Sequence, residues 1–344
     1  MPLAAVTRGG HVESVHHGSI AIVDLCGRLL YGAGNPERMT FTRSTLKPFQ
    51  ALPFVAAGGV ERFGLSAAET ALLCASHSGE PRHVTAAAAI LAKAGNGEVD
   101  LQCGAHPPGF HEVRGEVPPP PPYSPLAHNC SGKHAGMLAH CVACGYGKHD
   151  YLAMGHPLQL EIRRAVGVLT GAAEDALPVG TDGCSAPNYA VPLGRLALAF
   201  AHLAADTPHP VYGNAPRQLA AAMLAHPQMV SGEGRGDLTL TRAGRGDWVC
   251  KVGAEGVQAI GVRSRGLGIA IKIEDGARRA LMSVTVAALE QAGLLDADAR
   301  AAVAAQVAPV LRNGRNIATG DISPTFVLDK LSGVLAQPAA TDHH

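Results

Sequence analysis

Residues 43–48 read Arg43-Ser44-Thr45-Leu46-Lys47-Pro48, and an apolar segment from Phe49 to Val55 follows at once. A proline is tolerated only in the first turn of a helix, so the pattern predicts a helix that begins near Ser44. Ser44 and Lys47 would then share one helix face. A desolvated lysine can take the proton of a serine hydroxyl, which is typical of hydrolases that form an acyl-enzyme. The alternative is an N-cap serine with a solvated lysine.

The composition is that of a globular protein with a large core. The chain has 344 residues, of which 47% are hydrophobic and 16% charged, and its formal net charge is zero. Such a charge balance lacks the excess of positive charge that is typical of nucleic-acid-binding proteins. No apolar run reaches the ~18 residues that span a bilayer. The first ten residues lack the pattern of a signal peptide. We therefore expect a cytoplasmic protein without a nucleic-acid or membrane partner, whose eight cysteines are thiols or metal ligands.

Strand patterns occur near both ends of the chain. Residues 11–33 alternate loosely between turn signals, and three further segments read as antiparallel strands at 247–252, 258–262 and 268–273, before a helix at 276–293. Helical patterns occupy the middle, at 67–75, 81–94, 131–144, 157–170, 187–204 and 215–226. We expect an α/β (α+β) fold with an antiparallel sheet built from both termini. It would form a single domain over 1–344, in which a helical lobe at roughly 64–226 is inserted between sheet-forming segments 1–63 and 227–344.

A second serine and a second lysine stand in distinctive surroundings. Ser76 lies in a polar corner after an apolar segment, and Lys251-Val252-Gly253 follows a strand pattern. The latter tripeptide is similar to the Lys-Thr-Gly of serine β-lactamases and penicillin-binding proteins, with valine in place of threonine. Two lysines near one pocket would lower each other's pKa. The alternatives are a turn serine and an edge-strand lysine that guards against aggregation.

Two clusters of reactive groups precede expected helices, at 128–137 and 180–188. Cys130 and Cys184 each stand close to a glycine, and thiolates at helix starts bind zinc well. Two buried thiols are the alternative, and a Cys-x-x-Cys at 141–144 is more typical of a core face. A Gly-rich charged loop, 229–237, would border a pocket or lie on the surface.

Taken together, these blocks resemble the rhizobial-type (thermolabile, type II sequence family) L-asparaginases. The resemblance implies a β-lactamase-like fold and two Ser–Lys pairs. Ser44, as nucleophile, and Lys47 would form the first pair, and Ser76 and Lys251 the second. Lys251 is preferred to Lys272 for its glycine context. The matching blocks are 43–48, 76–80, 128–136, 180–188, 232–237 and 251–256.

The same resemblance implies a zinc ion and a substrate site. Cys130, Lys133 and Cys184 correspond to zinc-binding positions, although a lysine ligand is unusual because it must be neutral. Arg43, His134 and Asp182 would contact the substrate, and the alternative for His134 and Asp182 is to support the zinc ligands.

The expected activity is hydrolysis of L-asparagine to L-aspartate and ammonia through an acyl-enzyme, with zinc ordering the pocket. The substrate is then a small molecule, and a homodimer is expected from the prevalence of such assemblies. The alternative nucleophiles are Ser76 and a metal-bound water. The alternative functions are another serine amidohydrolase of the β-lactamase or peptidase type, and a non-catalytic, zinc-stabilised amino-acid-binding protein.

Overall fold

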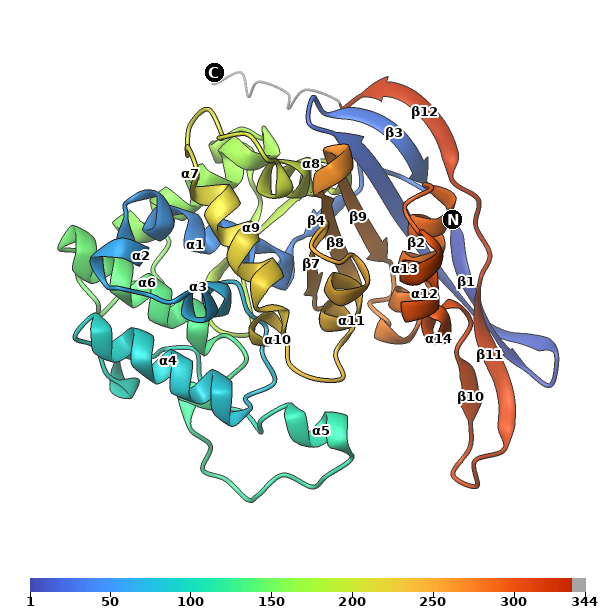
Figure 1. The fold of residues 1–344 in the computed structure, drawn as a ribbon, viewed down its shortest axis with the longest axis horizontal. Coiled ribbons are helices and arrows are strands. Elements are labelled where there is room, and N and C mark those ends of the chain that lie inside the picture. Colours follow the sequence, from blue (N-terminus) through green and yellow to red (C-terminus); the bar gives the residue numbers. More distant parts are fainter. Residues whose placement is uncertain (336–344) are drawn as a thin grey trace.

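A large antiparallel sheet is built from the two ends of the chain (Figure 1), in a computed structural model that describes residues 1–335. The strands run in the order β10-β11-β1-β2-β9-β8-β7, with β3 paired to β2 and β12 to β3. The structure confirms the expected mixed α/β fold and its antiparallel sheet from both termini. The strands are β1 (Pro2–Arg8), β2 (His11–Asp24), β3 (Arg28–Ala33), β7 (Trp248–Gly253), β8 (Val257–Val262), β9 (Leu267–Ile273), β10 (Val310–Arg312), β11 (Ala318–Pro324) and β12 (Asp329–Val334).

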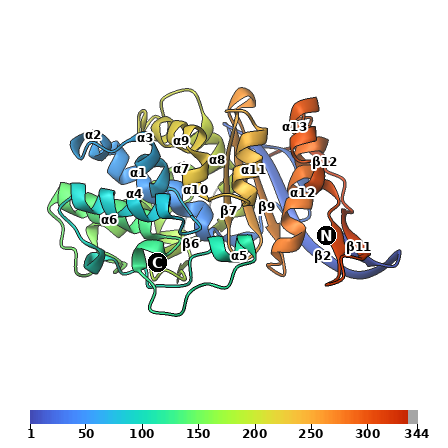
Figure 2. The same ribbon diagram turned by 60° about the horizontal axis from the view of Figure 1, so that its bottom comes forward.

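Both faces of this sheet are covered, which explains why its central strands carry so few polar residues. Successive side chains of a strand point to opposite faces. On β2, Ile20 and Ile22 belong to one hydrophobic cluster, and Ala21 and Val23 belong to the other. Helix α12 (Arg278–Gln291) packs on the first face and α8 (Leu193–Ala204) on the second (Figure 2). A Cβ atom at Gly268 would lie 1.8 Å from the carbonyl oxygen of Ala197, so this glycine permits α8 to approach the sheet.

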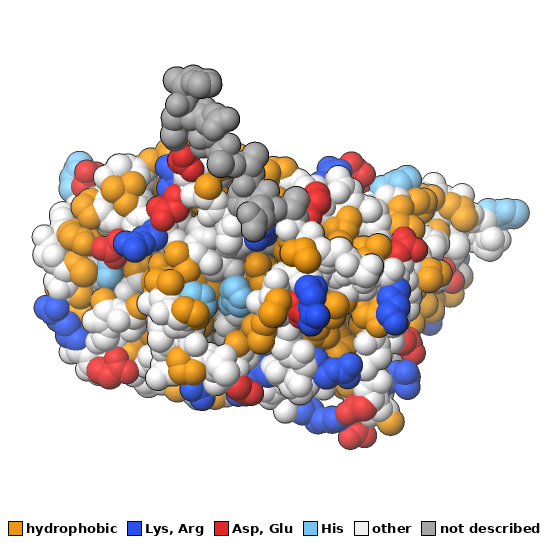
Figure 3. Space-filling view, turned by 90° about the horizontal axis from the view of Figure 1, so that it is seen from above, with side chains coloured by type: hydrophobic (Ala, Val, Ile, Leu, Met, Phe, Trp, Pro, Cys, Tyr) orange, Lys and Arg blue, Asp and Glu red, His pale blue; other side chains and the backbone are white. Residues whose placement is uncertain are grey.

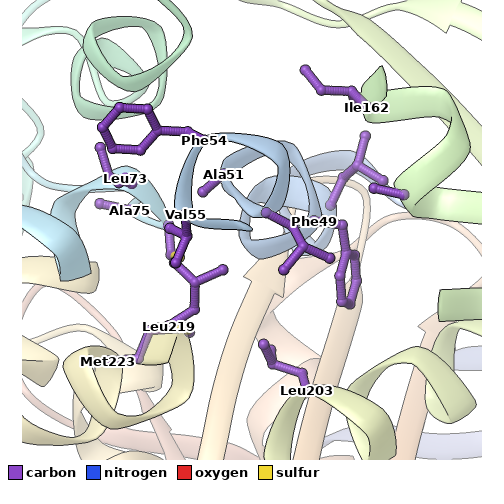
Figure 4. Close-up of a cluster of buried hydrophobic side chains, with 14 of the residues drawn as sticks. Phe49, Ala51, Phe54, Val55, Leu73, Ala75, Ile162, Leu203, Leu219 and Met223 are labelled. Atoms are coloured by element: carbon purple, nitrogen blue, oxygen red, sulfur yellow. The ribbon is translucent and has the colours of Figure 1, made fainter. Parts of the chain in front are cut away.

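The helical part of the molecule is organised around α1 (Lys47–Ala56), which begins after a short 3₁₀ turn, η1 (Arg43–Leu46). Pro48 lies in the first turn of α1, as expected. Phe49, Phe54 and Val55 point outward from α1 into a buried cluster that includes Leu219 and Met223 (Figure 4). The other helices are α2 (Gly59–Arg62), α3 (Ala67–Leu73), α4 (Pro81–Lys93), α5 (Phe110–Arg114), α6 (Ser131–Cys144), α7 (Pro157–Thr170), α9 (Ala215–Ala225), α10 (Pro227–Val230), α11 (Gly236–Ala243), α13 (Ala297–Ala302) and α14 (Ala304–Val307).

One expected helix is in part a strand. The helical pattern read over 187–204 divides into β6 (Pro187–Pro192) and α8. Pro192 is the reason, because inside a helix it would remove a hydrogen bond and clash with the preceding turn, whereas it serves here as the N-cap of α8. The tail of the expected sheet-forming segment, 336–344, lies outside the described residues.

A small second sheet brings two distant segments together. Its order is β4-β6-β5, with β4 at Met39–Phe41 and β5 at Val179–Thr181. Thr40 pairs with Val191, and Gly180 pairs with Asn188. The residues that follow β4 and β5 are therefore held side by side, and these are the segments that carry Arg43 and Asp182.

The surface and the helix lengths bear on the expected partners. Within residues 1–335, no helix is both long and apolar enough to cross a membrane. On the face seen in Figure 3, Lys and Arg side chains are interspersed with Asp and Glu. Cys141 is buried on α6, whereas Cys144 of the same Cys-x-x-Cys pattern is exposed, so the two thiols do not share a core face.

Candidate active site

Ser76 lies between two buried lysine amines. Its Oγ is 2.9 Å from Lys47 Nζ and 2.9 Å from Lys251 Nζ. Neither lysine has any exposed surface, and Ser76 is 4% exposed. The backbone N–H of Ser76 donates to the carbonyl of Val230, which fixes the loop after α3. One hydroxyl thus links an amine on α1 with an amine on β7, which are 204 positions apart in the chain.

Lys47 is held as a buried amine by carbonyl groups. Its Nζ donates to the carbonyl of Ala75 at 2.6 Å and to that of Asn129 at 3.3 Å. Burial lowers the pKa of Lys47, and the charge of Lys133 lowers it further, while the thiols of Cys130 and Cys184 act in the opposite direction. An amine whose pKa is lowered by its surroundings is suited to act as a general base.

Lys251 has a carboxylate neighbour that Lys47 lacks. Its Nζ donates to the carbonyl of Val252 and is 3.6 Å from Asp237 Oδ2. Burial lowers the pKa of Lys251 to about 8, with Asp237 raising it and Lys47 lowering it. Near pH 7 this amine therefore carries its proton. Lys272, the other candidate, donates instead to the carbonyls of Glu255 and Ile273.

Ser44 is placed one short turn before Lys47, on η1. It is half-buried, and its hydroxyl makes no hydrogen bond with any residue of the described chain, 1–335. The amine of Lys47 contacts Ser76 and not Ser44, so the expected first pair is not joined by a direct hydrogen bond. Ser44 is nonetheless more exposed than Ser76, and exposure is what a nucleophile that must reach a substrate requires.

A cavity of about 390 Å³ opens beside η1 and the small sheet. Two of the expected substrate residues, Arg43 and Asp182, line it. They form an ion pair in which Arg43 Nε is 2.9 Å from Asp182 Oδ1. Glu255 lies on the other side of the guanidinium, with its Oε1 3.7 Å from Arg43 Nη1. Although burial raises the pKa of Asp182, Lys133 and Arg43 bring it below its usual value, so the group is a carboxylate. The cavity thus offers both signs of charge.

The expected zinc positions come together behind this cavity. Lys133 Nζ is 2.9 Å from Cys184 Sγ, and a hydrogen bond with Cys184 lowers the pKa of Cys130 well below its usual value. His134 is fully buried and does not line the cavity; its Nδ1 is 2.7 Å from Tyr151 Oη. Burial lowers the pKa of His134 to about 4, and its Nε2 has no hydrogen-bond partner in the described chain.

The thiols of this set are ligands that zinc prefers, whereas Lys133 must lose a proton to bind a metal, because Cys184 and Cys130 raise its pKa despite its burial. Thiolates and neutral imidazole nitrogens are the ligands that zinc prefers, and the unpartnered Nε2 of His134 is a spare donor. Among residues 1–335 no group of three or more His, Cys, Asp or Glu side chains is arranged to hold a metal. A metal here would therefore depend on the amine of Lys133 as well as on the two thiols.

Comparison with known proteins identifies the family. The sequence profile of L-asparaginase II matches residues 4–324. The chain belongs to the L-asparaginase II family. This confirms the resemblance found in the sequence. No curated protein matches the chain.

Solved structures of Mglu resemble this family member distantly. Mglu in its native form aligns with a TM-score of 0.43 and 16% identity, over 82% of this chain and 66% of that chain. A second Mglu structure gives a TM-score of 0.34 and 16% identity, over 81% and 68%. Mglu in its tris and glutamate form gives 0.34 and 15%, over 86% and 64%. The chain thus spans about two thirds of the length of these structures.

Two residues that hold the site were not singled out in the sequence of this L-asparaginase II family member. Asp237 accepts hydrogen bonds from the N–H of Val252 at 2.9 Å and from Gln258 at 3.2 Å. Asn188 accepts from the N–H of Arg43 and donates to its carbonyl, both at 3.0 Å. Both residues belong to polar blocks that the sequence did mark, but only the fold shows which atoms they hold.

The two hydrogen bonds with Asn188 hold the backbone of Arg43 in a strained conformation. Arg43 has a φ of +48°, a value that non-glycine residues rarely adopt. Asn188→Ala would leave buried backbone groups unpaired and release this turn. We expect the free energy of unfolding to fall by about 1–3 kcal/mol, measured by urea denaturation. An unchanged free energy of unfolding in Asn188→Ala would show that these hydrogen bonds do not stabilise the turn.

Proposed function

We propose that this member of the L-asparaginase II family hydrolyses L-asparagine to L-aspartate and ammonia. One observation carries the proposal: two buried lysine amines contact the hydroxyl of Ser76, and one of them, Lys47, lies three residues after the half-buried Ser44 on the turn before α1. The adjacent cavity suits a zwitterionic amino acid. Arg43 would take the α-carboxylate, and Asp182 or Glu255 the α-ammonium group.

The chemistry follows from the two amines. Burial lowers the pKa of Lys47, and in its neutral form Lys47 accepts the proton of the Ser44 hydroxyl as Ser44 Oγ attacks the side-chain amide carbon. Backbone N–H groups near the start of the helix stabilise the oxyanion. Ser76 passes the proton from the lysines to the amide nitrogen, so the C–N bond breaks and ammonia leaves. Water then attacks the aspartyl ester, with Lys47 again as the base, and Ser44 regains its proton.

The same arrangement supports a β-lactamase-like architecture with an inserted helical lobe. A Ser-x-x-Lys at a helix start, a second serine on a loop and a lysine on an edge strand are the parts that such enzymes combine. In this chain they come from η1–α1, the loop after α3, and β7. Gly253 lets β7 approach η1, since a Cβ atom there would lie 2.9 Å from the carbonyl oxygen of Thr42.

We further propose that Cys130, Lys133 and Cys184 hold one zinc ion per chain. When bound, zinc would order the pocket and raise substrate affinity. Removing it with a chelator should lower the melting temperature and raise KM more than it lowers kcat, measured by calorimetry and by ammonia release. Cys184→Ser should lose the metal, whereas Cys26→Ser, at an exposed thiol, should keep it. Less than a tenth of an equivalent of zinc in the purified protein, with no effect of chelator, would refute the site.

The proton on Lys251 predicts the alkaline side of the pH profile. The proposed active form carries one proton on the lysine pair, on Lys251, and its pKa is about 8. Because Lys251 is protonated below that pKa and neutral above it, kcat should fall as the pH rises through about 8. Asp237 raises this pKa, so Asp237→Asn should move the alkaline limb to lower pH. A limb that stays in place in this variant would contradict the assignment.

An ammonia-release assay tests the proposed function itself. The substrates are asparagine, glutamine and propionamide, with a chromogenic β-lactam in parallel. We expect ammonia from asparagine at the highest kcat/KM. Ring opening of the β-lactam without ammonia release would indicate a β-lactamase-type hydrolase. Tight binding of asparagine without turnover would indicate a binding protein.

A further inference from the structure

A second cavity, of about 490 Å³, is distinct from the cavity beside η1 and borders the serine–lysine site only through Asp237 and Val252. It is formed by α5, the start of α11, the β7–β8 hairpin and the start of α12, which gather on one side of the sheet (Figure 2). None of the expected catalytic or zinc residues lines it. Its lining residues are Glu112, Val113, Gly234, Arg235, Gly236, Asp237, Val252, Gln258, Arg278, Arg279, Leu281 and Met282.

Arg235 brings an unpaired guanidinium into this cavity. The side chain is half-buried, yet it forms no hydrogen bond or ion pair with any residue between 1 and 335. Burial and the neighbouring charge of Arg278 lower the pKa of Arg235, whereas the charges of Asp237 and Glu112 raise it. A guanidinium stays protonated in proteins, so the group is a partly desolvated cation that forms no direct ion pair with either carboxylate.

The other charges around the cavity leave a positive surplus. Arg278 is also without a partner within the described chain, and Arg279 donates to His16 and Ser14, neither of which is an anion in that contact. Among the lining residues, three guanidinium groups thus face two carboxylates, and Arg279 is also attracted to Asp275 and Glu13 outside the lining. Asp237 is already engaged by backbone and side-chain donors and by Lys251, which leaves only the exposed Glu112.

Two helix N-termini add to this surplus. Helix α11 begins at Gly236 and α12 at Arg278, and both ends line the cavity. The first N–H groups of a helix are free to donate, and the helix dipole favours an anion there. The walls are closely packed: a Cβ atom at Gly236 would lie 2.9 Å from Met282 Sδ, and one at Gly234 would lie 2.5 Å from Val113 Cγ1.

We propose that this cavity binds a small organic oxyanion, a carboxylate or a phosphate ester, on Arg235 and Arg278. A guanidinium presents two parallel N–H donors that match the oxygens of either group. The cavity is larger than a single ion needs, and Val252, Leu281 and Met282 offer apolar contact to a carbon skeleton. The inference stands on this cavity alone and does not depend on the reaction proposed above.

Calorimetric titration of the full-length protein tests the site, at fixed ionic strength and with chloride as the reference anion. The probes are inorganic phosphate, glycerol 3-phosphate and succinate. Comparing the two phosphates with succinate distinguishes a phosphate site from a carboxylate site. We expect saturable binding by at least one probe. Arg235→Gln should weaken it at least tenfold, and Arg278→Gln should weaken it as well if Arg235→Gln fails to fold.

Two controls separate this site from the substrate cavity. Arg242 is exposed on α11, the helix that follows Arg235, and Arg242→Gln should bind the probe like the parent protein. Arg43→Gln should also keep full affinity. Absence of saturable binding by every probe would overturn the inference. So would undiminished affinity in both Arg235→Gln and Arg278→Gln, or a loss of binding in Arg43→Gln alone.

Discussion

Ser44→Ala is expected to lower kcat for asparagine hydrolysis by about 10⁴-fold or more. Loss of a catalytic serine removes the covalent route entirely, and nucleophile deletions in serine hydrolases cost on the order of 10⁶ in kcat. The fold should be unaffected, since the Ser44 hydroxyl bonds to nothing in residues 1–335. The measurement is ammonia release, together with urea denaturation of the same preparation.

The kcat of Ser76→Ala must be compared with that of Ser44→Ala to decide which serine is the nucleophile. Ser76 passes a proton in the proposed scheme, so its loss should slow the reaction by a smaller factor, about 10²–10⁴. Ser264→Ala, at an exposed position, should be neutral. If Ser76→Ala were inactive while Ser44→Ala kept a tenth of the parent activity, the nucleophile would be Ser76.

Lys47→Arg is the second substitution with a large expected effect. Arginine keeps the positive charge but cannot give up its proton, so it cannot serve as the base. We expect kcat to fall by about 10²–10⁴-fold. Lys47→Met should be equally inactive, because it fills the same space without an amine. Both kcat and the melting temperature should be measured, since the methionine variant separates lost chemistry from lost packing.

The control for Lys47 is another lysine that lies far from the serines. Lys93 forms an ion pair with Glu69 at 2.7 Å near the start of α3, and Lys93→Arg preserves that pair. It should retain the parent kcat. Full activity in Lys47→Arg would remove Lys47 from the role of base and leave Lys251 as the candidate.

Local signals in the sequence placed most of the helices correctly. Ser66 and Glu69 form the capping box that their spacing predicts, and α6 and α7 have the expected bounds. Both α6 and α7 end at a glycine with positive φ, Gly145 and Gly171, and such a glycine commonly terminates a helix. The expected antiparallel sheet was also readable, because short apolar segments of strand length are separated by turn residues.

The direction of the side chains at the site was not readable in the same way. Spacing places Ser44 and Lys47 on one helix face, but the amine of Lys47 turns to the loop after α3, where it contacts the carbonyl of Ala75 and the hydroxyl of Ser76. That loop is 29 positions away, and Lys251 is farther still. Such contacts arise from packing of α1, α3 and β7, and no local pattern specifies them.

Asn188 and Asp237 were missed for a related reason. Each acts through hydrogen bonds to the backbone of a residue far along the chain, which leaves no pairwise signature in the sequence. The strand at β6 was missed because its six residues are mostly apolar and run directly into α8. The proline at position 192 was the one local sign of the boundary.

The proposed reaction passes through a covalent aspartyl ester at one serine. Rapid acid quenching of the enzyme during turnover of asparagine, followed by peptide mapping with mass spectrometry, measures that species directly. The predicted result is one aspartyl group on the peptide that contains Ser44, formed and consumed at rates consistent with kcat. An adduct confined to the Ser76 peptide, or steady ammonia release by the parent enzyme with no adduct on either peptide, would contradict it.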